Sequence, residues 1–275
     1  MMGRMSDQRV TIEITDHVAD VRLNRGDKHN GLDTAMFEGL RDAAARVRDD
    51  QDVWAVVLSG NGPSFCAGLD VQDAVTSGAF SQADSLDQRL DGELVNLYQA
   101  VAYDWRRVAA PVIAAIHGNC FGGGLQVALG ADIRIASTDA RLSVMEIKWG
   151  LIPDMGLAVT LPPLVRQDVA KELTFTGRIF SGLEGRELGV VTRVAEDPRA
   201  AALELAREIA SKSPDATRFG KRLLNEAWAA DDAESLLLES RLQKALIGSP
   251  NQIATVQAQF EKRPAEYAAP TLQVD

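Results

Sequence analysis

The stretch PVIAAIHGNCFGGGLQVALG, residues 111–130, contains the signals of a buried strand, a tight turn and a helix in direct succession. Residues 111–118 form a nearly continuous apolar run, which is typical of a strand that is covered on both faces. Three consecutive glycines, Gly122 to Gly124, follow this run, and they cost backbone entropy unless bare backbone is needed there. Two positions further on lies Gln126, a neutral amide where a carboxylate would be chemically more useful.

An earlier stretch, SGNGPSFCAGLD at residues 59–70, has the same layout after the apolar run 53–60. Each turn is predicted to open a helix, where backbone N–H groups are unpaired and the helix dipole is positive. Two such turns on neighbouring parallel strands would aim N–H donors from two directions at one point. This is how a protein builds an oxyanion hole from its main chain. A glycine triplet alone indicates only a tight turn with close packing, so the pair of turns carries the functional prediction.

Strand and helix patterns alternate through the first two thirds of the chain. Apolar and polar residues alternate over 10–15 and 18–25, as in half-buried strands, and Asp33 is a candidate cap for a following helix. We expect a helical stretch over 81–108 and a further strand over 132–137. Strands separated by helices favour an α/β fold with parallel pairing through right-handed crossovers.

The last third of the chain is helical by pattern and rich in alanine, leucine and charges. We therefore place a boundary between a core at residues 1–197 and a helical region at residues 198–275. These helices are too few to bury a good core of their own, so we expect them to pack on the body or on a partner subunit.

Composition excludes several classes of function. The net charge of −10 and the pI of about 4.9 give no basic surface for nucleic acid. The two cysteines, Cys66 and Cys120, are far apart and fit neither a disulfide framework nor a zinc site, so we expect no metal. No stretch reaches the roughly 18 apolar residues of a membrane span, and the first residues lack the apolar core of a secretion signal. We therefore expect a cytoplasmic protein that binds neither membrane nor nucleic acid.

Five segments carry a family resemblance that covers nearly the whole chain. They are LNRGDKHNGLD (23–33), AVVLSGNGPSFCAGLD (55–70), the segment from PVIAAIHG to KWGLIP (111–153), TGRIFSGLEGRELGVVTRV (176–194) and QFEKRPAEY (259–267). In this order they strongly resemble the crotonase (enoyl-CoA hydratase/isomerase) superfamily. The resemblance implies a ββα-spiral core with C-terminal helices that mediate a homotrimer or a hexamer. It also implies acyl-CoA substrates of fatty-acid metabolism, with no cofactor besides the coenzyme A of the substrate.

The chemistry that this family shares is the stabilisation of a thioester enolate by two backbone N–H groups. The resemblance assigns these donors to Leu69 and Gly123. Losing one preorganised donor of this kind typically costs ~3–4 kcal/mol of transition-state stabilisation. Around the first turn, the resemblance implies that Ala67, Gly68 and Asp70 contact the substrate.

Hydratases of this family hold and activate a water with two glutamates, whose positions match Gln126 and Glu146 here. A glutamine can orient a water but cannot accept its proton, so hydration with two carboxylates is compromised. Glu146 can still carry a proton.

Asp154, eight residues after Glu146, matches a position at which dienoyl-CoA isomerases of the family carry an aspartate. Two carboxylates at the ends of a conjugated system can shift its double bonds, because one removes a proton and the other delivers one. An aspartate after proline is also typical of a turn or a helix cap. We predict an enoyl-CoA or dienoyl-CoA isomerase; the alternatives are a hydratase in which Gln126 orients the water and a non-catalytic acyl-CoA-binding paralogue.

Other residues are expected to support the site. Lys28 and His29 lie in a segment that runs beside CoA in the family, and Lys262 is a phosphate partner by resemblance. Most lysines and loop histidines are simply solvated. We expect His117, at a strand end before the second turn, to have a packing or supporting role and not a catalytic one, and Trp149 to lie in the core or in a pocket wall.

Overall fold

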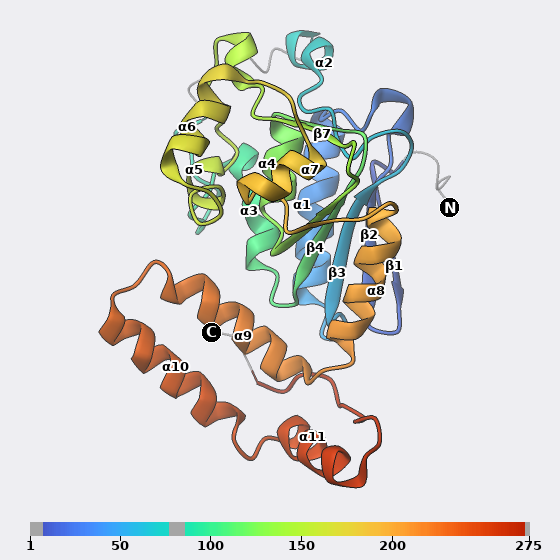
Figure 1. The fold of residues 1–275 in the computed structure, drawn as a ribbon, viewed down its shortest axis with the longest axis vertical. Helices are drawn as coiled ribbons and strands as arrows, with labels where there is room; N and C mark the ends of the chain where they lie inside the picture. Colours follow the sequence, from blue (N-terminus) through green and yellow to red (C-terminus); the bar gives the residue numbers. More distant parts are fainter. Residues whose placement is uncertain (1–7, 77–85, 273–275) are drawn as a thin grey trace.

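Six strands form the main sheet, which lies at the centre of the upper body in Figure 1. The structure, a computed structural model, describes residues 8–76 and 86–272. The strand order is β1 (Val10–Thr15), β2 (Val18–Leu23), β3 (Ala55–Gly60), β4 (Val112–Ile116), β6 (Ile133–Ala136) and β9 (Arg193–Val194). β1 pairs antiparallel with β2 across a tight turn at Asp16 and His17, and the remaining neighbours pair parallel. The predicted α/β class with crossover connections is confirmed.

A second sheet of three strands contains β5 (Asn119–Phe121), β7 (Arg141–Ser143) and β8 (Phe180–Ser181). β5 follows β4 after two residues and leads into helix α4 (Gly123–Leu129), and β7 follows β6 in the same way. The chain therefore repeats a unit of main-sheet strand, small-sheet strand and helix. This repeat is the ββα spiral that the family resemblance implies.

Helices cover both faces of the main sheet. α1 (Thr34–Asp49) and α3 (Leu97–Arg107) share one buried apolar cluster with Leu58 of β3. α8 (Pro198–Ala210) packs on the opposite face, in a second cluster that contains the neighbouring Val57. Successive side chains of a strand point to opposite faces, so β3 is buried on both sides. This is why its sequence is a continuous apolar run.

The helix that the sequence predicts over 81–108 is shorter in the structure. α3 begins directly after Asn96, which forms a reciprocal capping box with Gln99, and residues 86–95 are turns and irregular structure. Residues 81–85 lie outside the described residues. The other short helices are α2 (Val71–Thr76), the 3₁₀ helices η1 (Gly26–Lys28) and η4 (Glu146–Trp149), α5 (Leu157–Thr160), α6 (Gln167–Thr176) and α7 (Gly182–Leu188).

Three helices project from one end of the sheet in Figure 1, and we call them the C-terminal arm: α9 (Pro214–Ala227), α10 (Asp232–Leu246) and α11 (Pro250–Glu261). The boundary expected at 197/198 coincides with the start of α8, but α8 packs on the sheet, so the projecting part begins after it. No helix in the described part of the chain is long and apolar enough to cross a membrane. The arm exposes many large apolar side chains, namely Leu224, Trp228, Leu236, Leu237, Ile247, Ile253, Val256 and Phe260.

Buried cations attach the first helix of the arm to the body. The ammonium of Lys221 lies 2.7 Å from Asp132 Oδ2 and donates to the carbonyls of Trp105 and Ala110. Its burial lowers the pKa of Lys221, and the charge of Asp132 opposes that shift. The guanidinium of Arg218 donates to Val53 O at 3.0 Å. α9 is therefore fixed to the core by polar contacts, whereas the rest of the arm extends away from it.

Candidate active site

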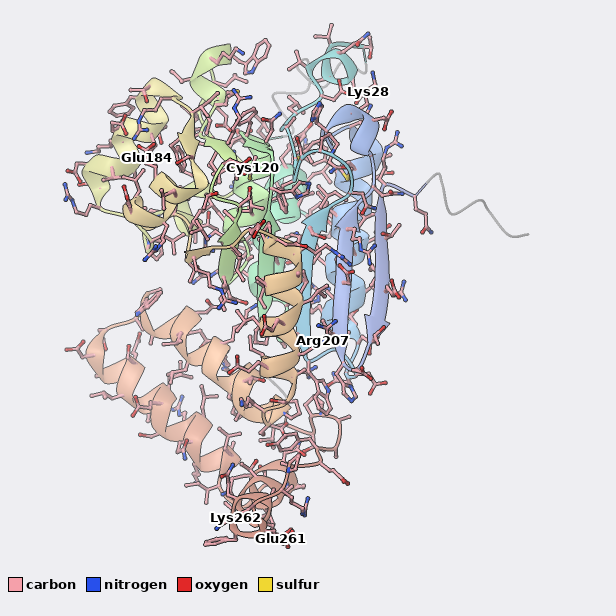
Figure 2. The ribbon with its side chains drawn as sticks, turned by 45° about the vertical axis from the view of Figure 1, so that its right-hand side comes forward. Lys28, Cys120, Glu184, Arg207, Glu261 and Lys262 are labelled. Atoms are coloured by element: carbon pink, nitrogen blue, oxygen red, sulfur yellow. The ribbon has the colours of Figure 1, made fainter. Side chains whose placement is uncertain are left out.

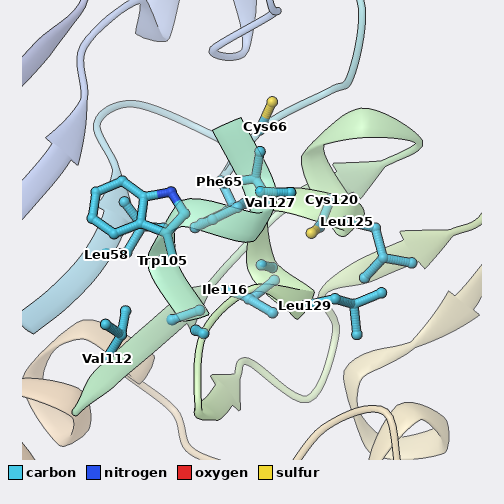
Figure 3. Packing of buried hydrophobic residues seen from close by; sticks show 14 of the residues in the cluster. Leu58, Phe65, Cys66, Trp105, Val112, Ile116, Cys120, Leu125, Val127 and Leu129 are labelled. Carbon is cyan, nitrogen blue, oxygen red and sulfur yellow. The ribbon is translucent and has the colours of Figure 1, made fainter. Parts of the chain in front are cut away.

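The two glycine turns lie side by side because a short parallel ladder joins them. Cys66 N donates to Asn119 O at 3.1 Å, and Phe121 N donates to Cys66 O at 3.0 Å, around a bridge between Cys66 and Cys120. Figure 3 shows both cysteines within the packed core near Trp105. Burial raises the pKa of the Cys66 thiol to about 12, so both cysteines are small packing residues, as predicted.

Each turn presents a backbone N–H group that has no acceptor among the described residues. Gly68 bends the first turn with a φ of 89°, and a Cβ on it would lie 2.7 Å from Phe121 O and 3.6 Å from Gly123 N. The N–H groups of Leu69 and Gly123 donate to no acceptor in the described part of the chain. The structure thus brings the two turns into contact and leaves unpaired the donors that the resemblance assigns to an oxyanion hole.

Close contacts explain the end of the glycine run. A Cβ on Gly123 would lie 2.8 Å from Met155 Sδ and 2.9 Å from Leu32 Cδ1. A Cβ on Gly124 would lie 2.4 Å from Cys66 O, which belongs to the ladder between the turns. The bare backbone therefore lets the second turn approach the first turn and the segment that carries Met155.

Glu146 opens η4 and carries its carboxyl to the start of the second turn. Its Oε1 lies 3.3 Å from the position that a Cβ on Gly122 would occupy, and it accepts a hydrogen bond from Gln126 Nε2 at 2.7 Å. Its Oε2 is buried and has no hydrogen-bond partner among the described residues. Burial raises the pKa of Glu146, and the charge of Asp154 raises it further, whereas the hydrogen bond from Gln126 lowers it. A carboxylate in this setting is a good proton acceptor.

Gln126 lies on α4 and is almost completely buried. Its Oε1 accepts from Met155 N at 2.8 Å and from Leu157 N at 3.3 Å, while its Nε2 donates to Glu146. The sequence predicts that this side chain contacts substrate or orients a water. In the structure, both ends of the amide are bound to protein.

Asp154 directly precedes the segment that Gln126 holds. It does not cap a helix, because α5 begins at Leu157 after Gly156 and has no side-chain cap. The residue keeps exposed surface, but the protein packed around its carboxyl raises the pKa of Asp154. Its charge also raises the pKa of Glu146, but less than the burial of Glu146 does.

Polar side chains that hold the first turn are not among the features predicted from the sequence. Asn30 is buried, and its Nδ2 donates to the carbonyls of Ser64 and Phe65 at 2.8 and 3.1 Å. Arg25 Nη1 donates to Asp70 Oδ2 at 2.8 Å. The resemblance implies that Asp70 contacts the substrate. In the structure, its carboxylate binds Arg25 and also accepts a hydrogen bond from a backbone N–H in the first turn of α2. The asparagine in the segment KHNGL is the signal that could have indicated these contacts.

The candidate CoA residues are separated in one chain. Lys28 and His29 are exposed at η1, where His29 hydrogen-bonds Ser64 Oγ at 2.8 Å and its carbonyl accepts from Ala67 N. Lys262 ends α11, and Figure 2 shows it at the opposite end of the molecule from Lys28. A single protomer therefore does not bring these cations together.

Two further predictions have different outcomes. His117 Nε2 donates to Gly62 O at 2.8 Å, so this side chain supports the first turn, as expected. Trp149 does not lie in the core, because its exposed fraction is 57%, and its place in a pocket wall stays a prediction. The 3₁₀ helix that carries it runs along the surface after Glu146, and Lys148 Nζ lies 5.7 Å from its ring centroid.

The structure is a ββα-spiral protein in which two backbone N–H groups, of Leu69 and Gly123, have no acceptor among the described residues near the carboxyl of Glu146. A family model described as enoyl-CoA hydratase/isomerase matches residues 13–270. The chain therefore belongs to the enoyl-CoA hydratase/isomerase (crotonase) family.

Individual relatives within this family carry different activities. The chain is 34% identical over 265 residues to the mitochondrial Delta(3,5)-Delta(2,4)-dienoyl-CoA isomerase of Mus musculus, covering 92% of this chain and 80% of the relative. It is 30% identical over 252 residues to the mitochondrial methylglutaconyl-CoA hydratase of Rattus norvegicus, covering 89% and 77%. The crystal structure of an enoyl-CoA hydratase from Bacillus anthracis matches with a TM-score of 0.87 at 30% identity, covering 96% of this chain and 100% of that chain. The residues of the site must therefore decide between isomerase and hydratase.

Proposed function

We propose that this chain is a double-bond isomerase of enoyl-CoA or dienoyl-CoA thioesters. The observation that carries the proposal is the carboxyl pair, in which the charge of Asp154 raises the pKa of Glu146. This pair accompanies the unpaired N–H groups of Leu69 and Gly123. The similarity to a dienoyl-CoA isomerase supports the same choice.

The isomerisation of a 3,5-dienoyl-CoA to a 2,4-dienoyl-CoA is a net proton transfer. The C2–H bond breaks when one carboxylate accepts the proton, and the electron pair spreads over C2, C4, C6 and the thioester oxygen. The N–H groups of Leu69 and Gly123 stabilise the charge on that oxygen. The other carboxyl then delivers its proton to C6, where a new C–H bond forms. No atom is gained or lost.

This reaction needs one ionised and one protonated carboxyl at the same time. Burial raises the pKa of both Glu146 and Asp154. In a coupled pair the first proton leaves more readily than the second, so the pair holds one proton over a window of pH. We expect a bell-shaped pH dependence of kcat/KM, with its window above the ordinary range of carboxyl titration.

Hydration is the second candidate, because other relatives of this chain are hydratases. It would require a group that orients the water opposite Glu146. The amide oxygen of Gln126 already accepts from two backbone N–H groups, and its nitrogen already donates to Glu146. These contacts favour the isomerase.

We further propose that CoA binds along η1 at Lys28 and His29, and that the C-terminal arm mediates a trimer or a hexamer. The exposed apolar side chains of the arm support self-association. Because Lys262 lies at the far end of the arm, it can contact a CoA held at Lys28 only from another copy of the chain.

The test is to offer a 3,5-dienoyl-CoA and crotonyl-CoA to the pure protein. We expect the first to gain the absorbance of a conjugated dienoyl thioester, and the Asp154→Asn variant to lose this activity while it keeps the melting temperature. Rapid loss of enoyl absorbance from crotonyl-CoA alone would contradict the isomerase proposal. Tight binding of both thioesters with no turnover would favour the non-catalytic alternative.

A further inference from the structure

We propose that Gln126 is a positioning residue that holds one oxygen of Glu146, so that the other oxygen, Oε2, is the atom that carries the proton. The inference rests on the proposed function for the identity of the substrate. Its geometry rests only on contacts within this chain.

The orientation of the Gln126 amide is set by the backbone. Met155 N and Leu157 N both donate to the same atom of the side chain, at 2.8 and 3.3 Å, and only the carbonyl oxygen can accept. The amide nitrogen must therefore face Glu146 Oε1, which lies 2.7 Å away. Gln126 cannot turn round to accept from Glu146 without leaving two backbone N–H groups unpaired.

The two oxygens of Glu146 are thereby made unequal. Oε1 accepts from Gln126 and lies against the backbone of Gly122. Oε2 is buried and has no partner among the described residues, which is costly for a carboxylate oxygen unless a ligand uses it. A lone pair free of competing donors on an oriented carboxylate is what proton abstraction from carbon requires.

Few charges face this carboxyl from the elements around it. α4 carries no charged residue, and the segment before α5 contributes Asp154, whose charge raises the pKa of Glu146. On η4 itself, Lys148 lies over the ring of Trp149. α6, which packs on η4, carries three charged residues, namely Asp168, Lys171 and Glu172.

Two of these α6 charges are already paired. Asp168 pairs with Arg166, and Glu172 pairs with Arg178. A backbone hydrogen bond of Glu146 itself lowers the pKa of this carboxyl, and Gln126 is the side chain that lowers it as well and so stabilises its ionised form.

The Gln126→Glu substitution distinguishes two roles of this side chain, the positioning of Glu146 and the support of the loop at Met155 and Leu157. Its carboxylate keeps an acceptor for Met155 N and Leu157 N, so the loop remains held, but the donor to Glu146 is replaced by an oxygen. The two backbone N–H groups favour ionisation of the new glutamate, so the proton of the pair stays on Glu146. We expect the pKa of Glu146 to rise by about one unit or more, which is the size of an interacting pair.

The experiment has one readout without substrate and one with it. Carboxyl ¹³C NMR of the wild-type protein, Gln126→Glu and Gln126→Met follows the titration of Glu146, which is assigned by its loss in Glu146→Gln. Kinetics with the dienoyl-CoA follow kcat, KM and the acidic limb of the pH profile. We expect both variants to lower kcat by about 10- to 100-fold, with KM within about twofold, because a misoriented base loses rate more than binding.

The melting temperatures of the two variants show whether Gln126 has only a structural role. We expect Gln126→Glu to melt near the wild type, and Gln126→Met to melt lower because two N–H groups lose their acceptor. An unchanged titration of Glu146 in both variants, or an unchanged acidic limb in Gln126→Glu, would overturn the positioning role. A wild-type protein that turns over no dienoyl-CoA would overturn the proposed function, and the NMR titration would still decide the role of Gln126.

Discussion

Two regions of the molecule, the site at the two glycine turns and the C-terminal arm, differ in which side chains they bury. In the site, polar groups such as Gln126 and Asn30 are buried and bound to backbone atoms. The atoms without a partner among the described residues are two N–H groups and Glu146 Oε2, to which the proposed function assigns roles. In the arm, large apolar side chains such as Trp228 and Phe260 remain exposed. This difference is what the proposed function requires, namely a proton-transfer site within one chain and an apolar surface for another copy of the chain. The predictions below test this division, from the largest expected effect to the smallest.

The first prediction concerns Glu146 and affects the site alone. We expect Glu146→Gln to lower kcat with a dienoyl-CoA by ~10²- to 10⁴-fold, since general acid–base catalysis contributes that much. The variant oxygen can still accept from Gln126, so the site keeps its shape. Glu187→Gln removes the same charge from an exposed position and should keep full activity.

The same variant gives a pH signature in stability. The folded-state pKa of Glu146 is raised, so the stability that its proton contributes is present at acid pH and is lost as the pH rises through that pKa. Thermal melts should therefore give Glu146→Gln and the wild type the same melting temperature at acid pH. As the pH rises through the folded-state pKa of Glu146, the variant should become progressively more stable than the wild type. A difference that shrinks with rising pH would contradict burial of this carboxyl.

The second prediction concerns the ion pair between Lys221 and Asp132, which attaches the arm to the body. Lys221→Met leaves Asp132 without its buried cation, and breaking a buried pair in this way costs about 3 kcal/mol of unfolding free energy. Urea denaturation measures the loss. Lys212→Met, at an exposed position, should stay within about 0.5 kcal/mol of the wild type. Equal stability of both variants would mean that α9 is not held by this contact.

The third prediction concerns the proposed role of the arm in self-association. Leu236 is 63% exposed on α10, and Leu236→Glu should shift the assembly toward monomer, because burying one leucine contributes about 1.5–3 kcal/mol per interface. Light scattering after gel filtration measures the mass. Leu94→Glu makes the same change at a side chain outside the arm that is 74% exposed, and it should leave the mass unchanged. A monomeric wild-type protein would remove the arm's proposed role.

The smallest effect is expected at the proposed CoA contact. Lys28→Met should raise KM a few-fold with kcat unchanged, because an exposed phosphate contact of about 1 kcal/mol binds ground state and transition state alike. The effect should decrease with added salt. Lys171→Met, on the exposed side of α6, is the matched control. A fall in kcat without a change in KM would place Lys28 in a different role.

Sequence reasoning succeeds where the signal is local. The helix after Asp33 begins as predicted, with Asp33 Oδ1 accepting from Met36 N at 2.8 Å, and both glycine turns lie where their apolar strands end. It fails where the partner is distant in sequence. The partners of Gln126 are backbone N–H groups of a loop about 30 positions away, and no pattern of side chains reports them.

The packing of α8 on the body is one of the two alternatives expected for the C-terminal helices, and the sequence does not decide between them. The buried face of α8 is a row of alanines, Ala202, Ala206 and Ala210, which resembles ordinary helix-forming composition rather than a core face. Small side chains allow the helix to approach the sheet closely, and only the packed structure reveals this. The separation of Lys28 from Lys262 likewise depends on the direction of the arm, which no local signal gives.

The glycine run has a consequence for how this site can change over evolutionary time. The obstacles to a side chain at Gly123 are the ends of two flexible side chains, Met155 and Leu32, so an alanine there can be compensated by smaller residues at those positions. The obstacle at Gly124 is the carbonyl of Cys66, which every residue possesses, so no second substitution relieves it. We expect related sequences to vary at position 123 together with 32 or 155, and to keep glycine at position 124.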